Sequence, residues 1–118
     1  SEVPVEALPD LPEAGLGMGS TGDAVRRLQR VLATLGYLNV RPWFWSCKAG
    51  TFEHKTQKAI ALYQVVHGVK CVESGVYCEN TRKSMLSMVE TAKKERAEHI
   101  RKTQEFLNRE AALNKAPP

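Results

Sequence analysis

The amino-acid sequence predicts an all-α fold of three helices, with an extended N-terminal arm and a long C-terminal helix. A Gly-x-aromatic-x-x-x-Thr motif occurs twice, at residues 50–56 and 75–81, and each copy leads into an amphipathic stretch. A third amphipathic stretch precedes them, and strong helix formers dominate the last quarter of the chain. We therefore expect a domain at residues 20–89, an arm at 1–19 and a helical extension at 90–118.

The arm is predicted to lack regular secondary structure. It contains three prolines and three glycines without a periodic apolar pattern. It is also acidic, since it has Glu2, Glu6, Asp10 and Glu13 but no Lys or Arg. We expect it to be ordered only when a partner holds it. The expected docking points are Val5, Leu8, Leu11 and Leu16.

The first helix is expected to begin at Ser20 or Thr21 and to end at Gly36. Ser20 and Asp23 have the spacing of a capping box, in which side chains satisfy the free amides of the first turn. Gly36 suits the left-handed residue that ends a helix. The apolar residues on one face of this helix are Val25, Leu28, Leu32 and Leu35.

The second helix is expected at residues 53–67, with Gly68 as its end. A connection at 69–76 follows, and we expect it to begin with a short extended segment. The third helix is expected to begin near Cys78 or Glu79. The predicted inner faces of these two helices carry Thr56, Ala59, Ile60, Tyr63 and Val66, and Thr81, Met85, Leu86, Met88 and Val89.

The third helix is expected to be much longer than the core it joins. Neither Gly nor Pro interrupts it before Pro117, so it should have about 35 residues and extend roughly 50 Å. A coiled-coil seam is not favoured, because Arg96, His99 and Thr103 would lie on it. We expect this helix to be exposed to solvent or to lie along another protein. The candidate docking residues are Ile100, Phe106, Leu107 and Leu113.

These motifs resemble the peptidoglycan-binding-like domain family, a small three-helix module usually appended to cell-wall enzymes. The resemblance covers about residues 17–89 and implies the fold of a binding scaffold. Members typically pair a Val-x-x-Leu-Gln-x-x-Leu helix and a Leu-Gly-Tyr turn with two Asp-Gly-x-Phe/Val-Gly-x-x-Thr turns. The positions that match are Val25, Leu28, Gln29, Leu32, Leu35, Gly36, Tyr37, Gly50, Phe52, Thr56, Ala59, Ile60, Tyr63, Gln64, Gly75, Tyr77 and Thr81.

Both turns depart from the family pattern. Ala49 and Ser74 replace the aspartate before the turn glycine, and Glu53 and Cys78 replace the second glycine. Loss of that glycine removes a permissive backbone position. The resemblance is therefore stronger for the fold than for contact with a glycan.

The connection at residues 37–51 contains the main candidate for a binding surface, an aromatic run with an arginine before it. This run includes Arg41, Trp43, Phe44 and Trp45. Indole rings stack on sugars or anchor protein interfaces, and three consecutive aromatic residues cannot all point inward. We expect at least one to be exposed, with capping of the small core as the alternative. Tyr63 and Gln64 complete the candidate contacts, although for Gln64 and Gln29 we favour hydrogen bonds to neighbouring loops.

The sequence predicts neither an enzyme nor a metal site. His54, His67 and His99 lack the spacing of metal ligands. No serine or cysteine has a base and an orienting acid in a recognisable motif. We therefore expect no catalytic residues, no cofactor and no bound metal.

The net charge of +4 combines an acidic arm with a basic body. A basic body favours acidic partners, but we interpret its Arg and Lys residues as a solvated face rather than a nucleic-acid site. No apolar run approaches the roughly 18 residues that span a bilayer, so no membrane span is expected. The compartment stays open; an organelle or the cell envelope is expected if Ser1 is a processed terminus. The basic residues are Arg26, Arg27, Arg30, Lys48, Lys55 and Lys58.

Three cysteines form an odd set without a CxxC pair, which does not favour a disulfide framework. We expect free, mostly buried thiols in a reducing compartment. One disulfide with a thiol left over is the alternative, and the pairs to test are Cys71–Cys78 and Cys47–Cys78.

Two functions follow as hypotheses. The favoured one is a non-catalytic structural or interaction subunit that docks other protein subunits through its arm and its C-terminal helix. The alternative is a peptidoglycan-binding anchor for a wall-modifying enzyme.

Overall fold

The computed structural model describes residues 8–38 and 48–115. Three helices occur in this part of the chain: α1 (Asp23–Thr34), α2 (His54–His67) and α3 (Glu79–Asn114). No β-strand accompanies them among the described residues, where β pairing is limited to two isolated bridges. The predicted all-α fold with a long C-terminal helix is confirmed.

Helix α1 begins later than predicted. Its N-cap is Gly22, which forms no side-chain capping bond, so the predicted capping box is wrong. The Ser20 hydroxyl instead accepts a hydrogen bond from the Gly17 amide at 3.1 Å, within the preceding turn. The end of the helix agrees with the prediction, because Gly36 has a φ of 92° just after the last turn.

Helix α2 has nearly the predicted bounds, and Gly68 ends it in the left-handed conformation. The connection after α2 is not extended as predicted, since residues 69–76 contain coil, bends and turns. Val66 and Leu86, expected on inner faces, are exposed. Leu86 lies about 100° around α3 from the buried Met85, and Val66 lies in the last turn of α2, where a small core covers only a narrow stripe of the helix.

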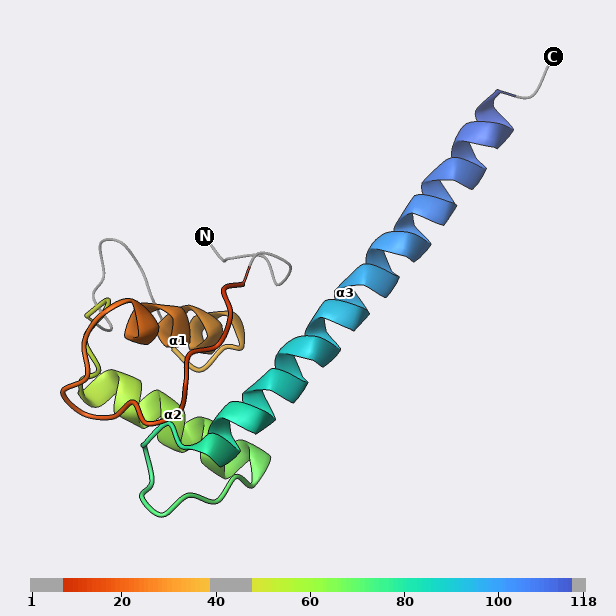
Figure 1. The fold of residues 1–118 in the computed structure, drawn as a ribbon. Helices are drawn as coiled ribbons and strands as arrows, with labels where there is room; N and C mark the ends of the chain where they lie inside the picture. Colours follow the sequence, from red (N-terminus) through yellow and green to blue (C-terminus); the bar gives the residue numbers. More distant parts are fainter. Residues whose placement is uncertain (1–7, 39–47, 116–118) are drawn as a thin grey trace.

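The core lies between α1, α2 and the first three turns of α3 (Figure 1). Helix α1 contributes Val25, Leu28 and Leu32 to it, while Met85 comes from α3. The turns before α2 and α3 add buried aromatic rings, Phe52 and Tyr77. The cluster is completed by Leu38, Ala59, Ile60 and Tyr63.

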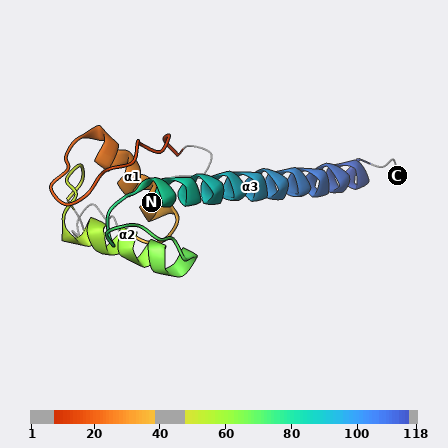
Figure 2. The ribbon, with the colours of Figure 1, turned by 60° about the horizontal axis from the view of Figure 1, so that its bottom comes forward.

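Helix α3 continues far beyond this core. It has 36 residues, whereas the last of its buried residues is Val89. Every residue from 94 to 115 is exposed. Figures 1 and 2 show this part of α3 projecting away from α1 and α2, which gives the molecule dimensions of 68 × 33 × 21 Å.

The described part of the arm, residues 8–19, packs on the domain. Leu8 is buried against Val31 and Val89, and Leu11 and Leu16 contact the same core. The prediction that the arm is ordered only with a partner is therefore wrong for these residues, because its leucines pack against apolar side chains of α1 and α3. Val5 lies outside the described residues.

Candidate functional site

The turn before α2 is organised around Gln29, a buried residue of α1. Its amide nitrogen donates to the carbonyls of Lys48 at 3.0 Å and Thr51 at 3.2 Å, and to the Thr56 hydroxyl at 3.0 Å. Its amide oxygen accepts from the Gly50 amide at 2.9 Å. We call Gln29, Gly50 and Thr56 the first turn cluster.

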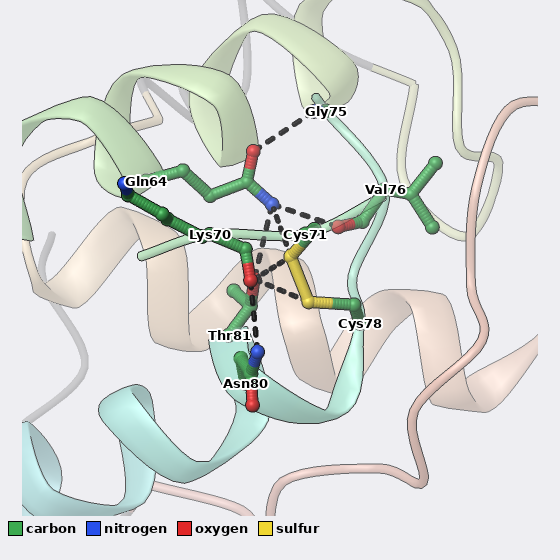
Figure 3. Close-up of a disulfide and its surroundings, with 8 residues drawn as sticks. All are labelled: Gln64, Lys70, Cys71, Gly75, Val76, Cys78, Asn80 and Thr81. Atoms are coloured by element: carbon green, nitrogen blue, oxygen red, sulfur yellow. Dashed lines mark hydrogen bonds between the residues drawn. A yellow bond between two sulfur atoms is a disulfide. The ribbon is translucent and has the colours of Figure 1, made fainter. Parts of the chain in front are cut away.

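The turn before α3 repeats this arrangement around Gln64 of α2 (Figure 3). The Gln64 amide nitrogen donates to the Val76 carbonyl at 2.8 Å and to the Thr81 hydroxyl at 3.0 Å. Its oxygen accepts from the Gly75 amide at 2.9 Å. We call Gln64, Gly75 and Thr81 the second turn cluster. The expected structural role of both glutamines agrees with these bonds, which satisfy buried polar groups of the turns.

The two motif glycines occupy conformations that a side chain would strain. Gly50 has a φ of 79° and Gly75 a φ of 81°, in the left-handed region that favours glycine. Each turn then places its aromatic side chain, Phe52 or Tyr77, fully in the core. The doubled motif therefore specifies two buried anchors for the chain between helices.

Residues 15–22 pair with both turns. Leu16 forms an antiparallel bridge with Tyr77, and Thr21 forms one with Thr51. The Tyr77 hydroxyl also donates to the Pro12 carbonyl at 2.8 Å. Burial is the main cause that raises the pKa of this phenol well above its ordinary value, and the nearby Arg82 opposes that shift. Tyr77 therefore remains a hydrogen-bond donor at neutral and moderately alkaline pH.

A disulfide joins Cys71 to Cys78 across the second turn (Figure 3). The expectation of free thiols is wrong for these two cysteines, and the first of the alternative pairs is the observed one. The seven-residue separation and the turn at Gly75 bring their Cα atoms to 6.1 Å, within the range of a disulfide. Cys47 lies outside the described residues.

The predicted contact residues fall into two groups. Arg41, Trp43, Phe44 and Trp45 lie outside the described part of the chain. Tyr63 and Gln64 are described and buried, so neither presents a surface for a ligand.

Tyr63 is part of an aromatic cluster inside the domain. Its ring lies 5.2 Å from that of Tyr37 and 4.2 Å from that of His67, measured between centroids. Its hydroxyl hydrogen-bonds the Ser84 hydroxyl at 2.8 Å, and burial raises its pKa. The residue therefore ties α2 to α3.

The distal part of α3 carries the four predicted docking residues in exposed positions. Their exposed fractions are 46% for Ile100, 55% for Phe106, 52% for Leu107 and 67% for Leu113. At about 100° per residue, these side chains project within one arc of about 140° around the helix. We call them the distal apolar face.

The ion-paired residues Glu98, Arg101 and Glu105 lie on the opposite side of the same segment. Arg101 pairs with both Glu98 and Glu105, and Lys102 lies 3.9 Å from Glu98. The hydrogen bond from Arg101 is the main cause that lowers the pKa of the Glu98 carboxyl. These pairs support a helix that has no tertiary cover, since a helix of this length in water depends on local interactions.

The sequence reasoning missed a second exposed apolar stripe, on α2. Leu62, Val65 and Val66 are all more than half exposed, while the opposite face of α2 enters the core. Their i, i+3, i+4 spacing was the signal that could have shown this stripe.

Among the residues that the structure describes, no three His, Cys, Asp or Glu side chains are grouped to hold a metal ion. Within the same residues, no helix is both long and apolar enough to cross a membrane. No family model, curated protein or solved structure was found to match the chain.

Proposed function

We propose that this chain is a non-catalytic interaction subunit, which docks another protein along the distal apolar face of α3. In this proposal residues 20–89 form a domain of the peptidoglycan-binding-like type that serves as a rigid base. The described residues of the arm are packed on that base and form part of it. The observation that supports the proposal is the continuous exposure of residues 94–115, which include four large apolar side chains.

The exposed part of α3 gains stability from a partner that covers its apolar side chains. A solvent-exposed helix of about 20 residues is marginal in water, even with favourable ion pairs. Ile100, Phe106, Leu107 and Leu113 each expose about half of their surface or more. Full burial of a large apolar side chain contributes about 1.5–3 kcal/mol, so covering the exposed half of each of these four contributes roughly 1 kcal/mol apiece to binding.

The chemistry of the face indicates the kind of partner. Ile100 and Leu107 are seven residues apart, as are Phe106 and Leu113, so the two pairs form parallel rows along the helix. Such rows fit a hydrophobic groove or a pair of helices on a protein partner. The ion pairs of Arg101 would then face solvent.

The test compares two double variants of the full chain. Phe106→Ser with Leu107→Ser removes the centre of the distal apolar face. Arg101→Ser with Glu105→Ser places the same residue type on the opposite side and leaves the net charge unchanged. The wild-type chain is cross-linked in extract of its source organism, and the partner is identified by mass spectrometry, purified and titrated against each variant.

We expect the apolar variant to lose affinity by about 100-fold, and the charged variant to change it by less than threefold. Circular dichroism checks that both keep the helix. Equal affinity of the two variants for the purified partner would contradict docking through this face. Sedimentation of the wild type alone shows whether the partner is a second copy.

The glycan-binding alternative has a separate outcome. The wild type and a deletion of residues 94–118 are incubated with purified peptidoglycan sacculi and sedimented. Retention of both proteins on sacculi, together with no protein complex dependent on α3, would favour the anchor function. We expect neither protein to sediment, because Tyr63 and Gln64 of the predicted contact set are buried.

A further inference from the structure

We propose that the Cys71–Cys78 disulfide is a redox-sensitive switch that controls how firmly the arm, at residues 8–16, is held on the domain. The inference concerns the domain and its arm, and it does not depend on docking by α3. The disulfide lies beside contacts of the arm, both of its cysteines are partly exposed, and the first turn folds without such a bond.

The arm is attached to the residues that flank Cys78. The Gly15 amide donates to the Tyr77 carbonyl at 2.8 Å, and the Tyr77 amide donates to the Leu16 carbonyl at 2.9 Å. The Pro12 carbonyl accepts from the Tyr77 hydroxyl at 2.8 Å and from the Arg82 guanidinium at 3.2 Å. These four bonds depend on the position of the chain around Cys78, whereas the packing of Leu8 on Val31 and Val89 does not.

The disulfide fixes that position. Cys78 is the N-cap residue of α3, and Cys71 lies in the connection after α2. The bond therefore closes the loop that contains Gly75 and Tyr77 and joins it to the start of α3 (Figure 3). Without the bond, residues 71–78 gain conformational freedom, which favours open states of the turn.

The disulfide lies at a partly exposed position. Both cysteines are only half-buried, and residues 72–74 and 79–80 beside them are exposed. A thiolate can therefore reach the bond without unfolding the core. This arrangement differs from that of a disulfide enclosed in a core, which reacts only after the protein unfolds.

A neighbouring polar group also favours reduction of the disulfide. The Gln64 amide lies 3.4 Å from the Cys71 sulfur, and the Thr81 hydroxyl lies 3.2 Å from it. A disulfide sulfur carries no hydrogen, so the Thr81 hydroxyl acts as the donor toward it, whereas the two hydrogens of the Gln64 amide have shorter contacts with the Val76 carbonyl and the Thr81 hydroxyl. The Thr81 hydroxyl, which also lies 3.4 Å from the Cys78 sulfur, would stabilise the negative charge that develops on Cys71 when an attacking thiolate binds to Cys78.

The reaction is a thiol–disulfide exchange with a dithiol. One thiolate of the reductant attacks the Cys78 sulfur, the bond between the cysteines breaks, and Cys71 leaves as a thiolate. The second thiolate of the reductant attacks the mixed disulfide and releases Cys78. The reductant ends as its own disulfide, it supplies two electrons, and the two protons of its thiols pass to the two cysteines.

The first turn shows that the reduced turn can stay folded. In the first copy of the motif, Ser46 and Glu53 stand 25 residues before Cys71 and Cys78, so no disulfide can form there. Residues 48–56 nevertheless form their turn with the Gln29 contacts. Reduction should therefore loosen the second turn and its arm contacts while the core persists.

The experiment measures hydrogen exchange of assigned amides in the full chain carrying Cys47→Ser, which leaves one cysteine pair. The protein is compared in its oxidised form and after reduction by dithiothreitol without denaturant. The reporters are the amides of Gly15 and Tyr77, which join the arm to the second turn. The matched controls are the amides of Gly22 and Phe52, which join the same segment to the first turn.

On reduction, we expect exchange at Gly15 and Tyr77 to accelerate at least tenfold more than exchange at Gly22 and Phe52. The Cys71→Ser with Cys78→Ser variant should show the same pattern without reductant. Equal acceleration at both pairs of amides would overturn the proposal, as would no acceleration. A mass shift of two hydrogens that appears only in denaturant would also overturn it. If the double variant does not fold, the reduced protein alone decides the outcome.

Discussion

The first and second turn clusters use the same three residue types in the same geometry, yet the second adds a disulfide. In each cluster a helix glutamine binds a glycine amide and a threonine hydroxyl, with the glycine–oxygen contact at 2.9 Å in both. The second turn also carries the arm through Tyr77 and starts the longest helix. The disulfide thus occurs in the turn that holds the arm and begins α3.

This difference separates two kinds of stabilisation. The glutamine satisfies polar groups that would otherwise be buried without partners, so its contribution acts on the folded state. The disulfide acts mainly by limiting the conformations of the opened chain. A turn that has only the first kind should lose its local order when its glutamine is removed, whereas a turn that has both should keep it.

The largest effect is expected from Gln29→Ala. It leaves the buried Gly50 amide and the buried Thr56 hydroxyl without their contacts to Gln29, and unsatisfied buried groups cost about 1–3 kcal/mol each. We expect a loss of about 4 kcal/mol in the free energy of unfolding, measured by urea denaturation. Gln64→Ala should cost less, about 3 kcal/mol, because one of its contacts is a weak one to sulfur.

Hydrogen exchange of the turn amides should distinguish the two glutamine variants more sharply than the free energy of unfolding does. We expect the Gly50 amide to lose its exchange protection in Gln29→Ala, whereas the second turn in Gln64→Ala keeps most of its protection until the disulfide is reduced. Gln104→Ala is the control, since Gln104 bonds only Asn108 among the described contacts on an exposed helix face. A cost for Gln29→Ala as small as that of the control would refute the role of the first turn cluster.

Substitution of each turn glycine by alanine should show how tightly neighbouring residues pack around that turn. A Cβ at Gly75 would lie 2.7 Å from the Gln57 side chain and 3.3 Å from its backbone oxygen, which α2 holds in place. A Cβ at Gly50 would lie 2.8 Å from the Arg26 side chain, which is exposed and can rotate away. Since left-handed backbone adds about 1–2 kcal/mol in both, we expect about 3 kcal/mol for Gly75→Ala and about 2 kcal/mol for Gly50→Ala.

Gly36→Ala supplies the reference for backbone strain alone. Gly36 has a φ of 92°, and nothing lies within 4 Å of a Cβ placed there. Thermal or urea unfolding should therefore rank the three variants as Gly75, Gly50 and Gly36 in decreasing cost. If all three cost the same, steric contact with α2 does not distinguish the second turn.

Local sequence patterns predicted the ends of α1 and α2 and the length of α3, whereas the capping box predicted for the start of α1 was wrong. The ends of α1 and α2 follow from Gly36 and Gly68, whose backbone needs a left-handed conformation. The length of α3 follows from a run without Gly or Pro. The paired glutamines were also assigned a structural role, which the contacts of both bear out.

Contacts between residues far apart in the sequence could not be predicted from local patterns. The arm is fixed by bonds that span 65 and 70 positions, from Tyr77 and Arg82 to Pro12, and no local periodicity encodes them. The disulfide depends on how the turn at Gly75 brings two sulfurs together, and spacing alone left two pairings open. The predicted docking residues of α3 are exposed as expected, whereas their partner is not specified by any residue pattern.

The aromatic positions of the two turns should respond differently to alkaline pH. Burial raises the pKa of Tyr77 above its ordinary value of 10.0, so the folded state keeps this proton longer than the unfolded chain does. The contribution to stability is complete below pH 10 and is lost as the pH rises above it. Phe52 in the first turn has no such group.

Tyr77→Phe tests this difference. We expect it to cost about 1–2 kcal/mol at neutral pH, through the lost bond to Pro12, and to make the decline in stability above pH 10 shallower. Tyr63→Phe is the comparison, because burial also raises the pKa of Tyr63 but its hydroxyl lies away from the arm. An unchanged alkaline decline in Tyr77→Phe would show that this phenol does not control it.

The smallest difference is expected between the two cluster threonines. Valine at Thr56 or Thr81 preserves shape and removes one hydroxyl, which should cost about 1 kcal/mol at either position.

The two hydroxyls differ in a second contact, since Thr81 lies 3.2 Å from the Cys71 sulfur and Thr56 has no cysteine in its described contacts. Thr81→Val should therefore slow reduction of the disulfide by dithiothreitol about threefold, because the leaving thiolate loses a charge-assisted hydrogen bond. Thr56→Val should leave that rate unchanged. Equal rates for the two variants, followed by mass spectrometry of alkylated samples, would mean that the second turn cluster positions the chain without assisting the chemistry of its disulfide.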